Sequence, residues 1–156
     1  MKALVVFYSL TGITRQIARE IAGLLDCDTE EIIDLKSRSG ILGFLSGSKD
    51  ALTRELTGIK QTSYDPANYD MVIIGTPVWA FTMAPAIRTY MNAYRERFRQ
   101  VAFFCTLGGA GGQKTLRDMQ DLCAKNSRAN LWITIKEMKR ASYFQEVKDF
   151  CDKLRT

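Results

Sequence analysis

Short and almost continuously apolar segments recur along the chain, and they constrain its fold more than any other feature. Four of them cover residues 3–8, 71–75, 101–106 and 131–135. Because polar side chains do not alternate with the apolar ones, these segments are typical of strands buried on both faces, as in a parallel sheet. A fifth segment, residues 31–35, mixes isoleucine and leucine with acidic residues and is expected to form an edge strand.

Helical periodicity separates the predicted strands, because apolar side chains recur three or four residues apart. These helices are predicted around residues 17–25, 87–94, 116–123 and 144–154. Pro85 stands near one helix start, where its missing N–H costs little, and Ser142 with Gln145 predicts a capping box at another.

Residues 36–69 are less regular, and Leu52 and Leu56 indicate a further helix near 48–57. The apolar, glycine-rich stretch Gly40–Leu45 precedes it. We interpret this stretch as a helix start packed on the sheet, with a partner-binding patch as the alternative.

Strands and helices therefore alternate along the whole chain. Such alternation predicts an α/β fold in which helices cover both faces of a doubly wound, five-stranded parallel sheet. A length of 156 residues suits a single domain spanning residues 1–156. No apolar run approaches the roughly 18 residues that span a bilayer, and no cleavage site follows the N-terminal apolar segment. We therefore expect a cytoplasmic protein without a membrane segment.

The chain contains no histidine, which excludes Ser-His-Asp and Cys-His catalysis and histidine-ligated zinc. Its four cysteines are Cys27, Cys105, Cys123 and Cys151. None forms a Cys-x-x-Cys pair, so each is expected to be a small buried side chain. These residue types predict neither a metal site nor a catalytic residue.

Positive charge is concentrated late in the chain. The net charge is +5, and residues 111–156 carry ten basic and six acidic side chains. Such asymmetry can indicate an acidic partner or a nucleic acid, but no basic stripe interleaved with aromatic residues is present. We interpret the charge as a solvated helix surface and expect no nucleic-acid ligand.

Ligands of doubly wound sheets bind beyond the carboxyl ends of the strands, where the strand order reverses. The loop after the first strand holds Ser9, Leu10, Thr11, Gly12, Ile13 and Thr14. Its three hydroxyl groups and its glycine lead into a helix N-terminus, which offers free N–H groups and the positive end of the helix dipole. The loop predicts a site for a phosphate monoester; in the alternative, Thr14 serves only as an N-cap.

Two further loops follow the strands at 71–75 and 101–106. The first holds Thr76, Pro77, Val78, Trp79 and Ala80, and the second holds Thr106, Leu107, Gly108, Gly109, Ala110, Gly111 and Gly112. An exposed tryptophan beside proline and valine suits stacking on a planar ligand, unless it folds back onto the third helix. Four glycines allow close backbone approach, unless the loop is only a flexible turn. A phosphate cradle, an aromatic wall and a backbone-rich edge together suit a flavin mononucleotide (FMN).

The motifs Ser-x-Thr-Gly-x-Thr, Gly-Thr-Pro-Val-Trp and the glycine-rich loop resemble the three flavin loops of the flavodoxin family, over essentially the whole chain. The resemblance implies a sheet of order 2-1-3-4-5, bound FMN and one-electron transfer between redox proteins. It implies phosphate contacts from Ser9 and from Thr11–Thr14, stacking by Pro77–Trp79, and ring and ribityl contacts from Thr106–Gly109. Ile13 departs from the family's asparagine, and the third loop lacks the family's aspartate and tyrosine.

Several functions stay open at this point. The alternative within flavoproteins is an FMN-dependent reductase that passes two electrons from NAD(P)H to a quinone-type acceptor, although no second Gly-x-Gly-x-x-Gly motif is present. Gly108 and Gln113-Lys114-Thr115 are one residue short of a P-loop, a remote alternative for a nucleotide-binding protein. A non-catalytic binding module is the third class. The basic C-terminal third favours an acidic, ferredoxin-like redox partner, and the oligomeric state stays open.

Overall fold

The computed structural model describes residues 1–140 and 142–156, and of Ile41 and Phe44 the backbone alone. Its strands are β1 (Ala3–Phe7), β2 (Asp28–Glu31), β3 (Met71–Trp79), β4 (Thr82–Met83), β5 (Gln100–Leu107) and β6 (Asn130–Thr134). Its helices are α1 (Ile13–Leu25), α2 (Gly40–Leu52), α3 (Pro85–Tyr94), α4 (Gly112–Cys123), α5 (Ile135–Met138) and α6 (Tyr143–Arg155), with short 3-10 turns at Pro66–Asn68 and Arg95–Arg97.

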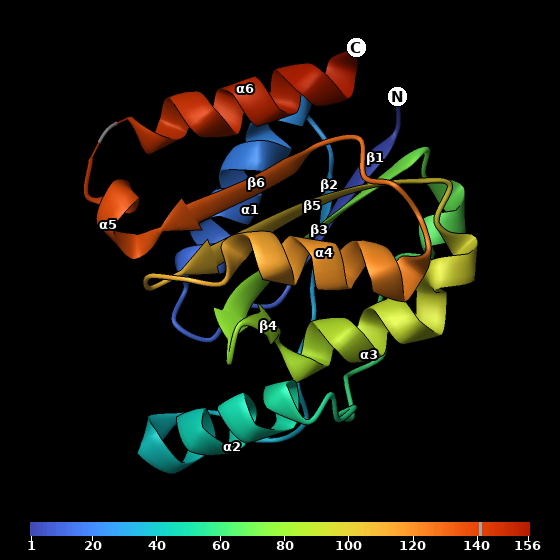
Figure 1. Ribbon diagram of the computed structural model, residues 1–156. Helices are drawn as coiled ribbons and strands as arrows, with labels where there is room; N and C mark the ends of the chain where they lie inside the picture. Colours follow the sequence, from blue (N-terminus) through green and yellow to red (C-terminus); the bar gives the residue numbers. More distant parts are fainter. Residues whose placement is uncertain (141) are drawn as a thin grey trace.

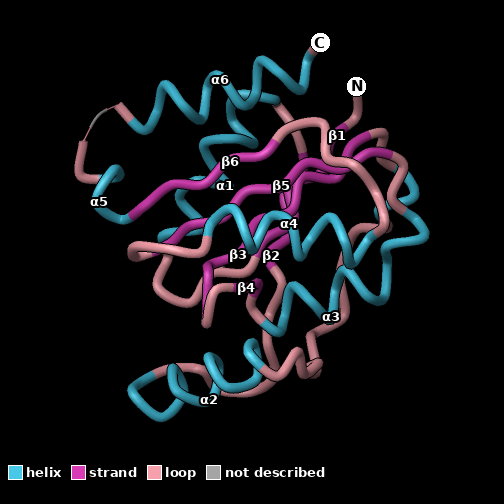
Figure 2. Tube along the Cα trace, viewed as in Figure 1, coloured by secondary structure: helices cyan, strands magenta, loops and turns pink. Residues whose placement is uncertain are grey.

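Five strands form one parallel sheet in the order β2-β1-β3-β5-β6, and β4 is added to β3 as a short antiparallel strand (Figures 1 and 2). The predicted order 2-1-3-4-5 numbers only the five strands of the parallel sheet. Since β4 is numbered here as well, the same order is written β2-β1-β3-β5-β6. The strand order reverses between β1 and β3, so the crevice for a ligand is expected above these two strands.

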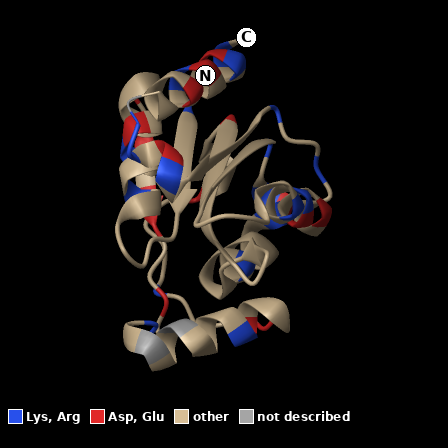
Figure 3. Ribbon diagram, turned by 60° about the vertical axis from the view of Figure 1, so that its left-hand side comes forward, with Lys and Arg blue, Asp and Glu red and all other residues tan. Residues whose placement is uncertain are grey.

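Helices cover both faces of the sheet, as predicted, and the alternation of side chains along the strands divides the core in two. Val5 and Ile73 point to one face, where α1 and α6 cover them. Leu4 and Val72 point to the other face, toward α3 and α4. Figure 1 shows α2 below α3 and farther from the sheet. In Figure 3 the charged residues lie mainly on the helices and loops.

Three sequence predictions about the strands and caps are wrong. The edge strand covers Asp28–Glu31 and not 31–35, because after Ile32 the chain leaves β1 and Asp34 instead bridges Ile59. β3 continues to Trp79, since its pairing with β5 extends to Pro77 and the hairpin with β4 follows. Ser142 makes no side-chain cap. A capping box forms instead at the start of α5, between Thr134 and Glu137.

The helix predicted near 48–57 begins earlier, at Gly40, and ends at Leu52. The stretch Gly40–Leu45 is therefore the first half of α2. Gly43 packs so closely on the backbone that a Cβ there would lie 2.3 Å from the carbonyl carbon of Arg38. Leu42 and Leu45 are exposed, whereas the side chains of Ile41 and Phe44 are outside the described part of the chain. No helix in that part is long and apolar enough to cross a bilayer.

Candidate functional site

The three loops meet around one cavity of about 300 Å³ at the carboxyl ends of β1, β3 and β5. It is lined by Leu10, Thr11, Ile13, Thr14, Pro77, Val78, Trp79, Thr106, Leu107, Gly108 and Ile135. All but Ile135 were predicted from the sequence. None of these side chains is charged, so the cavity is an apolar slot edged by hydroxyl groups.

The first loop turns at Gly12, which is the N-cap of α1 and has φ 95°. Gly12 N–H donates to Oγ of Ser9 at 3.1 Å. The hydroxyl of Thr14 is buried and lies 2.8 Å from that of Thr106, so it ties the first loop to β5 and is not the N-cap. The first N–H groups of α1 have no acceptor within the helix and remain available to an anion.

Arg15 is the nearest cation to this loop, and it is already paired. Its Nε and Nη2 donate to the two carboxylate oxygens of Glu31, at the end of β2, at 2.9 and 2.6 Å. The hydrogen bond to Glu31 raises the pKa of Arg15. A phosphate bound at the first loop would therefore depend mainly on neutral N–H and O–H donors.

Trp79 is not the exposed wall that the sequence predicts, since only 7% of it is exposed. Its ring meets Tyr8 edge-on, with centroids 5.6 Å apart, and it covers Gly47 of α2. A Cβ at Gly47 would lie 2.7 Å from Cζ3 of Trp79. The tryptophan thus fills the space between the cavity and α2 while part of it still lines the cavity.

The hairpin between β3 and β4 has an unusual two-residue turn. Ala80 and Phe81 both have positive φ, 48° and 62°, where glycine or asparagine is the usual choice. Such conformations are costly for other residues and concentrate at ligand sites. Phe81 is 59% exposed and is not among the residues that line the cavity. The sequence did not predict this turn, because alanine and phenylalanine are not typical of positive φ.

The glycine-rich loop approaches this hairpin closely. Gly111 is the N-cap of α4 with φ 99°, and a Cβ there would lie 3.0 Å from Cα of Phe81. Gly108 and Gly109 have free space around them, as a backbone edge open to a ligand requires. Thr76 faces away from the cavity, since its hydroxyl donates to the carbonyl of Pro77 and accepts from Ala84 N–H. Seven more of the predicted residues are likewise outside the lining of the cavity: Ser9, Gly12, Ala80, Gly109, Ala110, Gly111 and Gly112.

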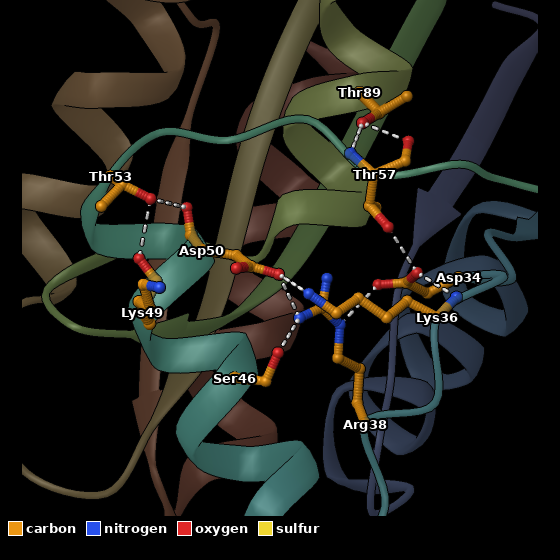
Figure 4. Close-up of polar contacts among 9 residues, drawn as sticks. All are labelled: Asp34, Lys36, Arg38, Ser46, Lys49, Asp50, Thr53, Thr57 and Thr89. Atoms are coloured by element: carbon orange, nitrogen blue, oxygen red, sulfur yellow. Dashed lines mark hydrogen bonds and ion pairs between the residues drawn. The ribbon is translucent and has the colours of Figure 1, made fainter.

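A buried ion network holds the loop before α2 against the body of the molecule (Figure 4). Arg38 donates from Nε to Asp34 at 3.0 Å and from Nη1 to Asp50 of α2 at 2.6 Å. Lys36 also reaches Asp50, at 2.7 Å, and Thr57 donates to Asp34 at 2.8 Å. Hydrogen bonds from Lys36 and Arg38 hold the pKa of Asp50 below its usual range despite burial. The network fixes α2, and therefore Gly47, behind Trp79.

Tyr8 lies between this network and the cavity. Burial, followed by the charge of Asp34, raises its pKa to about 12. It therefore stays a neutral phenol at any ordinary pH and contributes packing to Trp79 without adding charge.

Comparison with known proteins gives a consistent family. A model of the flavodoxin family matches residues 2–154. A flavoprotein from Lactobacillus acidophilus NCFM, solved in complex with FMN, is 23% identical with a TM-score of 0.75, over 90% of this chain and 98% of that one. A protein from Bacteroides eggerthii DSM 20697 with a provisional flavoprotein assignment is 19% identical with a TM-score of 0.79, over 99% and 98%.

A flavodoxin from Streptococcus pneumoniae TIGR4 is 14% identical, with a TM-score of 0.62 over 99% of this chain and 98% of that one. At these identities the likeness shows the fold. No curated protein sequence matches the chain. The match of the family model across almost the whole chain decides the assignment, and the chain belongs to the flavodoxin family.

Proposed function

We propose that the protein binds FMN in the cavity described above and transfers electrons between redox proteins. The observation that carries the proposal is the meeting of a helix N-terminus and an uncharged, largely apolar slot in one cavity at the point of strand reversal. A terminal phosphate suits the helix N-terminus, and a planar ring suits the apolar slot. The FMN complex of the Lactobacillus acidophilus flavoprotein, which shares the fold, supports this choice of ligand.

Each segment has a distinct role in the proposal. The N–H groups at the start of α1, with Thr11, bind the phosphate. Val78 and Trp79 form one wall of the ring site, and Leu107 with Gly108 forms its edge. Ile135 closes the slot from the junction of β6 and α5. The bound flavin would supply the redox chemistry, and the protein would bind it, orient it and exclude water.

FMN and flavin adenine dinucleotide can be separated by mass spectrometry of the ligand released from purified protein loaded with an equimolar mixture of both. FMN is the expected species, because the phosphate loop opens directly into a helix and accepts a terminal phosphate. Recovery of the dinucleotide as the main species would contradict the proposal.

The second candidate is the NAD(P)H-dependent reductase, and the uncharged lining of the cavity supports this function. No carboxylate lines the cavity, so nothing there repels negative charge on a reduced ligand or on an incoming nucleotide. Steady-state consumption of NAD(P)H with a quinone acceptor distinguishes the two functions: a carrier gives none. We also propose an acidic redox partner and a cytoplasmic location, from charge and composition alone.

A further inference from the structure

Arg88, in the first turn of α3, is a buried arginine whose charge has no carboxylate partner. It is 7% exposed. Its Nη2 donates to Oγ1 of Thr82 at 3.1 Å, whereas its Nε is buried and has no hydrogen-bond partner. No carboxylate of residues 1–140 and 142–156 forms an ion pair with it. A buried charge without a direct ion pair is costly, so this arginine needs an explanation beyond packing.

The side chain of Arg88 lines a second cavity, of about 210 Å³, which lies apart from the first. Arg54, just beyond the end of α2, lines the same cavity together with Asp118 and Asp121 of α4. Arg54 has φ 58°, so its backbone is held in the left-handed conformation next to this cavity. Burial, and after it the charge of Arg54, lowers the pKa of Arg88, while the charge of Asp118 acts in the opposite direction.

The carboxylate nearest to these arginines is already engaged. Oδ2 of Asp118 accepts from Oγ1 of Thr82 and from Nζ of Lys114, both at 2.6 Å. The lining of the cavity holds two arginines and two aspartates and is neutral in net charge. Two guanidinium groups therefore line one polar cavity, and neither forms an ion pair with a carboxylate of the residues that the structure describes.

We propose that this second cavity binds a small oxyanion, a phosphate or carboxylate group, between the guanidinium groups of Arg88 and Arg54. Guanidinium groups donate in a planar fork that matches the oxygens of both anions. Because one water molecule occupies about 30 Å³ of liquid, the cavity has room for a phosphate group with several waters. The proposal does not depend on FMN binding.

The position of Thr82 gives the site a connection to the first cavity. Thr82 donates to Asp118, accepts from Arg88 and pairs with Trp79 in the hairpin. An anion on Arg88 would therefore act next to the segment that carries Val78 and Trp79.

To test this site, the protein is first saturated with FMN if it binds FMN. It is then titrated with sodium phosphate, and separately with sodium acetate, at constant ionic strength. The Nε–H resonance of Arg88 is followed by NMR. At least one anion is expected to shift it saturably, and the arm that does so identifies the class. Arg54→Gln should weaken the binding at least tenfold, since Arg54 is exposed and its replacement leaves the core unchanged. Arg117→Gln, an exposed arginine of α4 outside the cavity, is the control and should bind as the wild type does.

Two results would overturn the proposal. The first is the lack of any saturable shift with either anion. The second is binding that Arg54→Gln leaves unchanged, because an anion at the start of α1 would behave in that way. Calorimetry of phosphate binding to Arg88→Gln is a further test. If this variant still binds phosphate, the proposed site is wrong.

Discussion

Two buried arginines flank the hairpin that walls the proposed flavin site, and their surroundings are opposite. Arg38 is ion-paired with Asp34 and Asp50, whereas Arg88 has a single hydroxyl partner, Thr82, and no ion pair within the described residues. Each keeps one buried nitrogen without a partner, Nη2 of Arg38 and Nε of Arg88. Both support the hairpin: Arg38 through α2 and Gly47 behind Trp79, and Arg88 through Thr82 at the end of the turn. The difference indicates that the ion-paired arginine serves structure, and it makes the arginine without an ion pair the better candidate for binding an anion.

The largest expected difference between the two arginines is in how much each contributes to the free energy of unfolding. Arg38→Met leaves Asp34 buried without a counter-charge and Asp50 with Lys36 alone, and we expect the free energy of unfolding to fall by about 3–5 kcal/mol. Arg88→Met removes a charge that has no ion-pair partner and should cost only about 1 kcal/mol, the contribution of its hydrogen bond to Thr82. Urea unfolding in chloride buffer free of phosphate measures both. Equal losses would remove the distinction between the two arginines.

The acid dependence of stability sharpens the same comparison. The pKa of Asp50 is lowered in the folded state, mainly by hydrogen bonding to Lys36. Its contribution to the free energy of unfolding is therefore present above the unfolded pKa of about 3.9. It is lost as the pH falls through the lower, folded value.

We expect Asp50→Asn to cost about 1.5–3 kcal/mol at neutral pH, the range for hydrogen bonds to charged groups. The gap between the variant and the wild type should narrow as the pH approaches 3. Urea unfolding between pH 3 and pH 7 gives this difference, and a gap that widens in acid would contradict the assignment.

A smaller effect tests the link between α2 and the cavity. Gly47→Ala places a methyl group against Trp79, and we expect a loss of about 1–3 kcal/mol from overpacking, with a shift of tryptophan fluorescence. Gly23→Ala, in α1, meets nothing within 4 Å and should stabilise the protein by about 0.5–1 kcal/mol. If both variants behave alike, the contact between Gly47 and Trp79 does not position the wall.

The elements that carry the site could be predicted because local patterns encode them. Apolar runs such as 71–75 and the periodicity after them determine the sheet and its helices, and topology then brings the three loops to one edge. The orientation of Trp79 could not be predicted in this way, since it depends on Gly47 and Tyr8, which are remote in sequence. Ile135 and Asp50, the partner of Arg38 in α2, were missed for the same reason: each contact joins elements that no local pattern relates.

Titration of FMN with the purified, flavin-free protein, followed by flavin fluorescence, is the most direct test of FMN binding in this cavity. We expect saturable quenching at one FMN per chain, because the ring would lie against Trp79 in the cavity lined by the three loops. We also expect weaker binding by about 1–3 kcal/mol in Trp79→Ala, as for the loss of an aromatic partner in a pocket. Fluorescence that stays unchanged up to a large excess of protein would show that the protein does not bind FMN.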